Sequence, residues 1–524
     1  MSFTPPLVTL VAKFDQSAFD LSVGAARTCY ASKAVAPEQV AKRPDLADKI
    51  FEAVLEAGHH TTIQHPHYTF LMQGVSRQFL WSFLHSHPFY NSEQQSQRYV
   101  EMKPDRLVIP PLEGKSRTIF MAMATEMMQA YFELNDLMRP FIEKEWFKLY
   151  SGRKADFLNK NERGKRWDAA IHKRTLEAAR YVIPVAMQAD LYHTISGLTL
   201  MRYWRMCEQF DAPGETKDIV GRMIGLVRED DPRYLSRLED PVPLQETPEY
   251  VMFTSFFGTG LNPYASEFIR EFDARLDGLQ ALLIGHDPNA EAALANAVRG
   301  IFGLPKSRMS DDDAIDVVLD PRKNSYLGST LNVNTLSKLS RALHVVNYTF
   351  EHRLSHTADS QSQRHRMIPG TRPILQAHFD PSEPDCIWPI SYRQVPEAMD
   401  KVTKLTAKVW KTIGDLLSEG VPWDCAQYLL PNATAVRYIE SGNLLNYHHK
   451  WHTRLCYLAQ EEIWRQCLEE VRQVSEVHPR IGKHIGPPCA MRNVAGMKPI
   501  CPEKDRYCGV PVWLRTLDQY ERVI

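Results

Sequence analysis

The sequence lacks the long apolar runs and the export signal that would assign it to a membrane or to a secretory route. No apolar run reaches the roughly 18–20 residues that a membrane-spanning helix needs. The first residues, MSFTPPLVTLVAKFDQ, have no basic stretch followed by a long apolar core. We therefore expect a cytoplasmic protein that has no membrane partner.

The sequence also lacks an excess of charge of either sign. Its 62 Lys and Arg residues oppose 63 Asp and Glu residues, which gives a net charge of −1. This balance excludes proteins that hold polyanions by bulk charge, so a nucleic acid is not indicated as a partner. It does not exclude a local basic pocket. With 44% hydrophobic residues among 524, the chain is expected to form several globular domains.

Cysteine is sparse, and nine cysteines spread over 524 residues do not indicate a disulfide framework. Three of them, however, lie in a Pro- and Gly-rich tail without periodicity, spaced as Cys489-x11-Cys501-x6-Cys508. Thiolates in such a segment are typical of a structural metal site, which organises loops that have no core. We predict a zinc site with these cysteines and His484 (or His478) as ligands. An iron–sulfur cluster, or three unrelated thiols, are the alternatives.

Apolar periodicity divides the chain into segments. It predicts helices at 117–150, 168–182, 263–284, 334–350, 395–419 and 455–475, and a strand at 68–72. Prolines and acidic residues without periodicity indicate a linker between the two helical regions. The predicted domains are 1–230, a linker at 231–249, a second domain at 250–477 and the Cys-containing tail at 478–524.

Two short sequences occur once in each half. Residues 93–99 read EQQSQRY and residues 359–365 read DSQSQRH, 266 positions later. Residues 179–184 read ARYVIP and residues 426–431 read AQYLLP, 247 positions later. Two such echoes in the same order favour an ancient duplication, and chance matching of the heptad is the alternative.

The Ser-x-Arg element inside the first echo has a chemical meaning. A guanidinium presents a fork of donors, and a nearby serine adds a hydroxyl, so the pair suits a phosphate or the edge of a pyrimidine. The alternative interpretation is a capped helix start beside a solvated arginine.

These motifs belong to an ordered set that resembles the flavin-dependent thymidylate synthases. The set consists of a His-rich stretch at 58–70, residues 74–78 (GVSRQ), His85-Ser86-His87, the Ser-x-Arg elements, residues 179–184, Gly442-Asn443, Arg454 and residues 459–463 (AQEEI). The family monomer is about half as long as this chain. We therefore identify the chain as a tandem-duplicated and divergent member, with copies at roughly 1–230 and 250–475.

The resemblance implies an α+β fold with two copies of a thymidylate synthase complementing protein-like domain, each with a sheet flanked by long helices, which form a pseudo-dimer. The family methylates the uracil of dUMP, takes carbon from methylenetetrahydrofolate and a hydride from reduced FAD, and uses NADPH as the reductant. The cofactor carries this chemistry while the protein orients it. Family members are tetramers with composite sites, so a homodimer of this chain, a pseudo-tetramer, is expected.

The resemblance also implies the site residues, although it assigns no catalytic one. The expected contacts to dUMP or another uracil nucleotide are Ser96, Arg98, Arg180, Ser362, Arg364 and Arg454. The expected contacts to the flavin are His60, Thr61, Gln64, His85, His87, His352 and Arg353.

Both copies depart from the family pattern. In place of its Arg-His-Arg signature we align His85-Ser86-His87 in the first copy and Glu351-His352-Arg353 in the second. The first copy keeps Arg180 but not the later arginine, whereas the second keeps Arg454 but has Gln427 at the earlier position. Two hypotheses follow. Either one composite site survives and transfers a methyl group to a uracil nucleotide, or the protein is a divergent paralogue that binds a nucleotide or nucleic acid without synthase activity.

Overall fold

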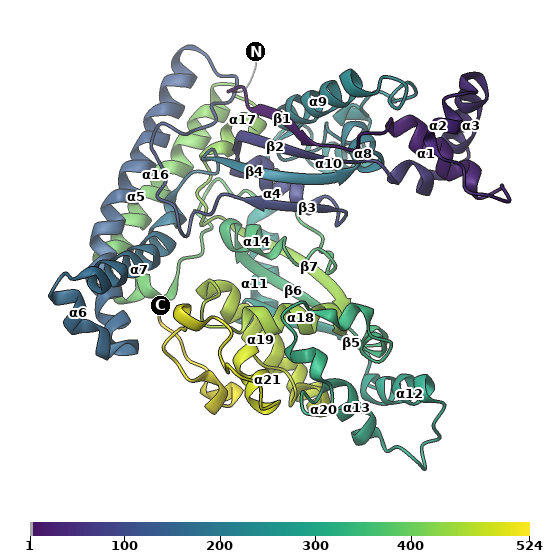
Figure 1. Ribbon diagram of the computed structural model, residues 1–524. Helices are drawn as coiled ribbons and strands as arrows, with labels where there is room; N and C mark the ends of the chain where they lie inside the picture. The colour runs from purple at the N-terminus through teal and green to yellow at the C-terminus, as the bar shows by residue number, and fades with distance from the viewer. Residues whose placement is uncertain (1–3) are drawn as a thin grey trace. The chain divides into compact units, whose positions relative to one another are not determined.

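The computed structural model describes residues 4–524, without the side chain of residue 505, and the chain divides into two compact units (Figure 1). The first unit consists of Met1–Met128, Ile183–Asn262 and Val409–Leu430, and the second of Gln129–Val182, Pro263–Lys408 and Pro431–Ile524. Each unit therefore takes segments from both halves of the sequence. The boundaries fall inside the helices α5 (Gly114–Leu149) and α16 (Pro396–Ser418), which confirm the helices predicted at 117–150 and 395–419.

The first unit is built on an antiparallel sheet. Its strand order is β1 (Leu7–Ala12), β2 (His67–Ser76), β4 (Gln188–Ser196) and β3 (Tyr90–Gln94). Buried residues alternate along β2 between Tyr68 and Met72, as expected for a strand with one face on a core. A bulge after Met72 contains Gly74, whose φ of +76° favours glycine.

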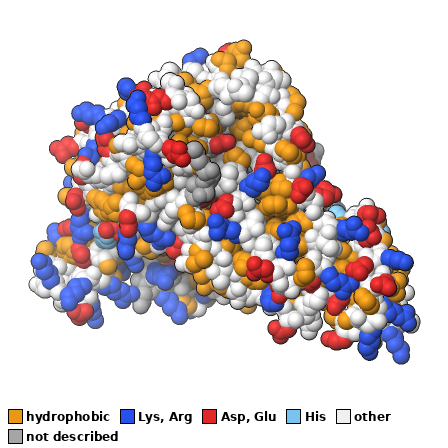
Figure 2. Space-filling model, turned by 90° about the horizontal axis from the view of Figure 1, so that it is seen from above, with side chains coloured by type: hydrophobic (Ala, Val, Ile, Leu, Met, Phe, Trp, Pro, Cys, Tyr) orange, Lys and Arg blue, Asp and Glu red, His pale blue; other side chains and the backbone are white. Residues whose placement is uncertain are grey.

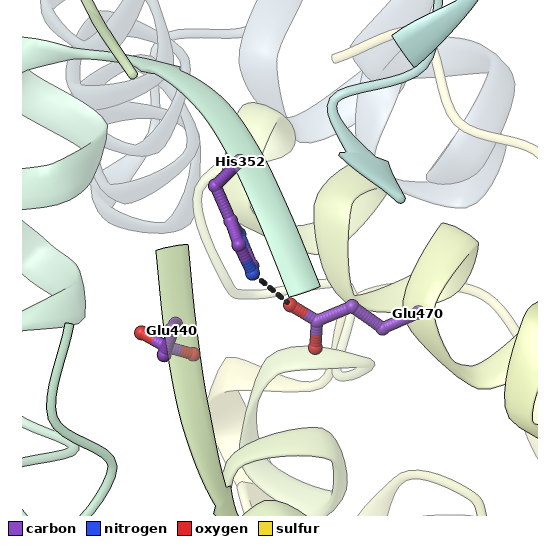
Figure 3. Close-up of side chains that lie close together, drawn as sticks. All are labelled: His352, Glu440 and Glu470. Carbon is purple, nitrogen blue, oxygen red and sulfur yellow. Dashed lines mark ion pairs between the residues drawn. The ribbon is translucent and has the colours of Figure 1, made fainter. Parts of the chain in front are cut away.

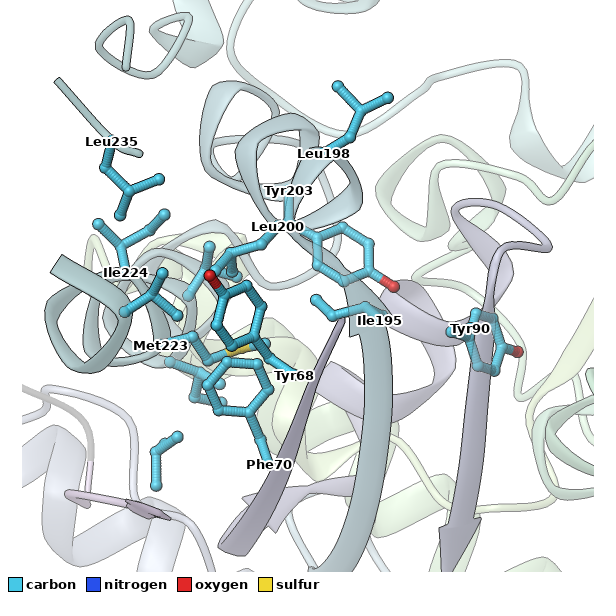
Figure 4. Packing of buried hydrophobic residues seen from close by; sticks show 14 of the residues in the cluster. Tyr68, Phe70, Tyr90, Ile195, Leu198, Leu200, Tyr203, Met223, Ile224 and Leu235 are labelled. Carbon is cyan, nitrogen blue, oxygen red and sulfur yellow. The ribbon is translucent and has the colours of Figure 1, made fainter. Parts of the chain in front are cut away.

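Helices cover this sheet and complete the first core. Those that lie wholly in the first unit are α1 (Ala18–Thr28), α2 (Pro37–Val40), α3 (Pro44–Glu56), α4 (Arg77–His85), α8 (Gly197–Arg205), α9 (Pro213–Asp230), α10 (Pro248–Phe257) and α17 (Trp423–Ala426). In Figure 4, Tyr68 and Phe70 of β2 face Met223 and Ile224 of α9 within one buried cluster. Each such side chain contributes about 1.5–3 kcal/mol by burial, so this cluster fixes the end of β2, from which α4 begins.

The second unit contains a smaller antiparallel sheet and more helices. Its strand order is β5 (Ala281–His286), β6 (Asn347–Ser355) and β7 (Ala435–Asn443). Its helices are α6 (Lys154–Leu158), α7 (Glu162–Ala179), α11 (Ala265–Leu276), α12 (Ala290–Phe302), α13 (Asp311–Leu319), α14 (His356–Ser362), α15 (Leu375–His378), α18 (Leu444–Arg454), α19 (Glu461–Val477), α20 (Pro479–Gly482) and α21 (Pro488–Val494). The helix predicted at 334–350 is wrong, because this stretch forms short 3-10 turns and the start of β6.

The two sheets repeat the same side-chain pairs, which confirms the duplication and the α+β fold. Both β2 and β6 carry the sequence Tyr-Thr-Phe. The hydroxyl oxygen of Thr69 lies 2.9 Å from that of Thr194, and the hydroxyl oxygen of Thr349 lies 2.9 Å from that of Ser441. Thr194 and Ser441 are 247 positions apart, which is the offset of the second sequence echo. That echo forms one short 3-10 turn in each copy, η3 (Arg180–Val182) and η9 (Gln427–Leu429).

The other sequence echo, the heptads at 93–99 and 359–365, does not form the same structure in the two copies. Residues 93–99 cover the end of β3, which pairs with β4, whereas residues 359–365 lie in α14 and the turn after it. In the second copy the place of β3 is taken by Gly370, which bridges to Glu440 of β7. The two heptads are therefore not equivalent, and their offset of 266 does not mark the repeat.

The surface agrees with the balanced composition. Acidic and basic side chains are interspersed over the face that Figure 2 shows. Within residues 4–524, no helix combines the length and the apolar character that crossing a membrane requires.

Candidate functional site

A buried glutamate holds the junction of a strand and a helix in the first unit. The backbone N–H of Ser76 donates to Glu215 Oε1 at 2.8 Å, and the hydroxyls of Ser76 and Tyr428 each donate to Oε2 at 2.6 Å. The Ser76 hydroxyl oxygen also caps α4, since it accepts from the N–H of Phe79. Burial raises the pKa of Glu215, and these hydrogen bonds oppose that rise.

The second unit repeats this junction with Ser355, Glu462 and Tyr181. The N–H of Ser355 donates to Glu462 Oε1, and the hydroxyls of Ser355 and Tyr181 donate to Oε2, all at 2.6 Å. Ser355 caps α14 by accepting from the N–H of Ala358. The tyrosines are exchanged between the copies: Tyr181 comes from the first half of the sequence but completes the junction of the second unit. The exchange arises because each unit contains segments of both halves.

The two junctions align the motif triplets of the copies. His85, the first residue of the triplet in the first copy, stands nine positions after the capping serine at 76. Nine positions after the capping serine at 355 the chain reads Arg364-His365-Arg366. This is an intact Arg-His-Arg, the signature of the family that the sequence resembles. The alignment to residues 351–353 is thereby corrected, because these residues lie inside β6.

Arg454 holds the histidine of this second triplet. Its Nε donates to Nε2 of His365 at 2.8 Å, and its Nη2 donates to the carbonyl of Gln361 at 3.1 Å. Since Nε2 accepts, the ring proton lies on Nδ1 and the imidazole is neutral. Burial, followed by the charge of Arg454, lowers the pKa of His365 well below its ordinary value.

Two polar atoms beside this pair lack partners among the described residues. The hydroxyl of Ser362 and Nε2 of Gln361 are buried and accept or donate no hydrogen bond within residues 4–524. Arg364 is exposed to solvent. Buried polar groups are normally satisfied, so orphaned ones next to arginines fit a ligand that offers oxygen acceptors.

Arg180 lies in the same unit as Arg364 and Arg454. Its side chain is buried, and its backbone carbonyl accepts from Nδ2 of Asn432 at 2.9 Å. The corresponding position of the first unit holds Gln427, whose Oε1 accepts from Nε2 of Gln78 at 3.4 Å. Arg180 comes from the first half of the sequence and Arg454 from the second half. Both belong to the second unit, because that unit contains segments of both halves.

The other Ser-x-Arg element belongs to the first unit. The N–H of Arg98 donates to the Ser96 hydroxyl oxygen at 3.2 Å. Arg77, at the start of α4, donates to Oε1 of Gln94 at 2.8 Å and to the carbonyl of Gln95 at 2.6 Å. Arg77 thus ties the segment before this element to α4, and a nucleotide contact there stays a prediction.

The flavin-side residues predicted for the first copy occupy two elements of the first unit. His60, Thr61 and Gln64 belong to the 3-10 turn η1 (His60–Gln64), where Thr61 and Gln64 are exposed and the His60 ring bonds to a backbone carbonyl. His85 ends α4, and Nδ1 of its ring lies 2.7 Å from the carbonyl of Trp81. The ring of His87 packs against that of Tyr203, with 4.9 Å between the centroids.

In the second copy, Arg353 lines a cavity of about 450 Å³. Its Nη2 lies 3.0 Å from a carboxylate oxygen of Asp385, and its Nε lies 3.2 Å from one of Asp273. Trp388 and Arg465 line the same cavity. The lining therefore combines aromatic rings and arginines with the carboxylates of Asp273 and Glu469.

His352 is fully buried and belongs to an ionic network. Its Nε2 lies 3.5 Å from Glu470, as the dashed line in Figure 3 shows, and Glu440 points toward the same space from β7. Among the described residues, these three are the set whose ligand atoms lie within 4.8 Å of one another. The space already holds a cation, since the ammonium of Lys450 lies 2.5 Å from Glu440 and 3.0 Å from Glu470. The network therefore suits a lysine rather than a metal ion.

The first unit shows that the fold does not require this network. The positions that correspond to His352, Glu440, Lys450 and Glu470 are occupied there by Met72, His193, Tyr203 and Met223. Met72, Tyr203 and Met223 belong to the buried cluster of the first unit, and Figure 4 labels the last two. Buried ion networks often add no net stability over apolar residues of similar volume, so the two units differ here in polarity without a difference in fold.

The predicted ligands of the tail lie in the second unit. Nε2 of His484 lies 2.9 Å from a carboxylate oxygen of Asp316. Cys489, Cys501 and Cys508 are reduced thiols.

Comparison with known proteins places the chain among similar sequences. The model of the family described as thymidylate synthase complementing protein matches residues 9–233 and 282–480. A flavin-dependent thymidylate synthase of Clostridium tetani is 28% identical over 209 residues, which cover 39% of this chain and 75% of that protein. One of Saccharolobus solfataricus is 31% identical over 147 residues, 27% of this chain, and the match spans only 55% of that relative. A solved structure of the UMP/dUMP methylase PolB from Streptomyces cacaoi, bound with 5-Br dUMP, has 18% identity and a TM-score of 0.31, and the match covers 45% of this chain and 94% of that one.

Proposed function

Because the chain belongs to the family of thymidylate synthase complementing proteins, we propose that it is a flavin-dependent methyltransferase that transfers a one-carbon unit to C5 of a uracil nucleotide. The proposed substrate is dUMP, the carbon donor methylenetetrahydrofolate, the cofactor FAD and the reductant NADPH. The observation that carries the proposal is the intact Arg364-His365-Arg366 triplet, which Arg454 holds in the unit that also contains Arg180.

The residues of the second unit fit a phosphorylated pyrimidine and a flavin. Arg364 presents an exposed guanidinium suited to a phosphate, and the unpartnered Ser362 hydroxyl and Gln361 amide offer donors to carbonyl oxygens. The cavity beside Arg353 offers aromatic rings to a planar cofactor and arginines to its phosphates, beside the two carboxylates that also line it. FAD, when bound, supplies the hydride.

The chain's own residues orient these groups. Arg454 keeps His365 neutral and fixes its ring, so that Nδ1–H is the donor available to a ligand. The Ser355–Glu462–Tyr181 junction fixes the first turn of α14, from which the triplet follows, and it fixes Tyr181 next to Arg180. Positioning of this kind is the protein's part in cofactor catalysis.

The first test is the visible spectrum of the protein as purified, followed by the release of tritium from dUMP labelled at C5. Bound flavin and tritium release that depends on methylenetetrahydrofolate would support the proposal. Protein that takes up no FAD on titration would contradict it. Bound nucleotide without tritium release would favour the second candidate, a paralogue that binds a nucleotide without methylating it. That candidate rests on the triplet of the first copy, where neither arginine is kept.

The assembly is part of the proposal. A homodimer would give twice the chain mass of 60.2 kDa in light scattering, and a monomer would contradict the expectation of composite sites.

A further inference from the structure

Six of the nine cysteines lie in the second unit, and four of these belong to the tail or to the segment that the tail contacts. Cys456 follows α18, Cys489 lies in the first turn of α21, and Cys501 and Cys508 lie in the tail. All nine cysteines of the chain are free thiols. Four reduced thiols in one neighbourhood, without a disulfide between them, are the usual sign of a metal centre in a protein that needs no disulfides.

Several contacts bring the tail back onto the segment after α18. Tyr457, the neighbour of Cys456, accepts at its carbonyl from Nη2 of Arg174 at 3.3 Å, and its hydroxyl oxygen accepts from the N–H of Glu521 at 3.1 Å. Its ring centroid lies 6.2 Å from that of Tyr520. These contacts hold the end of the tail beside Cys456.

Further contacts hold the rest of the tail in place. The Tyr150 hydroxyl donates to the carbonyl of Tyr507 at 2.8 Å, next to Cys508. Gly509, with φ of +84°, lies so close to Tyr150 that an added Cβ would come within 2.8 Å of its ring. The helix α21, which carries Cys489, packs against the turn η11 (Val512–Leu514) that follows Cys508. The tail therefore follows one defined path over the unit, although its structure after α21 consists only of short 3-10 turns.

Each of the six pairs among these cysteines is close enough for the charge of one thiolate to act on the other. Four thiolates in one neighbourhood would repel one another, and a bound cation removes that repulsion.

Nε2 of His484, the fourth ligand expected from the sequence, lies 2.9 Å from a carboxylate oxygen of Asp316. Cys456 offers the neighbourhood a fourth thiol. The sequence hides this partner because 32 residues separate it from Cys489, and because it lies inside the second copy rather than in the tail.

The spread of the sulfur atoms distinguishes between the metals. A zinc ion with Zn–S bonds of about 2.3 Å holds its four sulfur ligands about 3.8 Å apart. Among the described residues, no three of these cysteines bring their sulfur atoms within 4.8 Å of one another. A cubane cluster carries an iron at each ligated corner, so its thiolates stand farther apart than those of a single ion.

We propose that Cys456, Cys489, Cys501 and Cys508 ligate a [4Fe–4S] cluster that fastens the tail to the second unit. The proposal is independent of the proposed methyl transfer, since none of the nucleotide or flavin residues takes part. No cysteine outside this set is needed, and Cys29, which is exposed, provides a matched control.

The test is elemental and spectroscopic analysis of the full chain purified without oxygen. We expect about four iron atoms and about four sulfide ions per chain, and an electron paramagnetic resonance signal after reduction that differs from that of a flavin radical. Cys456→Ser should lose most of the iron, whereas His484→Gln and Cys29→Ser should keep it. Stoichiometric zinc without sulfide would overturn the proposal, as would iron retained in full by Cys456→Ser.

A second measurement does not depend on the folding of variants. Alkylation of the native wild-type protein should spare the four cysteines and modify Cys29, and removal of iron by a chelator should expose all four together. Equal labelling of the four before and after the chelator would overturn the proposal.

Discussion

Replacing Glu462 by Gln tests whether the second unit carries the ligand site. Its Oε2 accepts from the hydroxyls of Ser355 and Tyr181 at 2.6 Å each. An amide nitrogen at that position donates instead of accepting, so both hydroxyls must turn away. Each hydrogen bond to a charged acceptor contributes about 1.5–3 kcal/mol. The two hydroxyls can still accept hydrogen bonds from the new amide, which offsets part of this loss. We therefore expect the free energy of unfolding to fall by about 2–4 kcal/mol.

The chain provides a matched control in Glu215→Gln. This residue accepts from Ser76 and Tyr428 at the same distances in the first unit. Urea unfolding followed by tryptophan fluorescence should therefore report a similar destabilisation for both variants.

Nucleotide binding should separate the two variants. Glu462→Gln loosens the start of α14, after which the Arg-His-Arg triplet follows, and should weaken dUMP binding in calorimetry by about tenfold or more, which is about 1.4 kcal/mol. Glu215→Gln should change the affinity by less than about twofold. The reasoning is refuted if Glu215→Gln weakens dUMP binding as much as Glu462→Gln does.

Three further expectations concern stability. Lys450→Met removes the ammonium that lies between two buried carboxylates and leaves Glu440 with Arg372 at 3.7 Å as its cation. It should lower the free energy of unfolding in urea by about 3–5 kcal/mol, and an unchanged value would show that the network is not ionised. Burial lowers the pKa of His448 to about 3 and that of His452 to about 4, both below the unfolded value of about 6.5. Because the folded state keeps both rings neutral, the free energy of unfolding is highest above pH ~6.5 and falls as the pH drops below that value. The fall is about 1.4 kcal/mol per pH unit for each ring, and melting curves at a series of falling pH values measure it. Gly74→Ala should cost about 1 kcal/mol or more because φ is +76°, whereas Gly225→Ala inside α9, where nothing lies within 4 Å of an added Cβ, should stabilise by about 0.5–1 kcal/mol; thermal melts giving the same sign for both would contradict this.

The long helices and the duplication could be predicted from the sequence. The periodicity of 117–150 and 395–419 is sustained over many turns, so α5 and α16 follow from local pattern alone. The echo at offset 247 identifies the repeat because it covers a turn that both copies use in the same place.

The strand β6 could not be predicted, and the alignment of the second triplet failed with it. The segment NYTFEHRLS is buried on both faces in its second half, so it lacks the alternation that identifies a strand. Without that strand, the sequence alignment places residues 351–353 at the motif. The reliable signal is Ser355, a helix cap bonded to Glu462, and only the fold shows that bond.

Only the structure shows that the two arginines of the expected nucleotide site belong to one unit. Arg180 and Arg454 lie in different halves of the sequence, and the sequence indicates two incomplete sites. Because the boundary between the units falls inside α5, Arg180 belongs to the second unit. No local sequence pattern indicates this. The same holds for Cys456, whose partners lie at the far end of the chain.

The central claim, that the second unit holds the uracil nucleotide, is tested most directly by photochemical crosslinking. Irradiation with 5-bromo-dUMP, followed by mass spectrometry of the peptides, should label the segment that contains Ser362 and Arg364 or the segment that contains Arg454, and unlabelled dUMP should compete. Label confined to the peptide with Ser96 and Arg98 would contradict the account and move the site to the first unit.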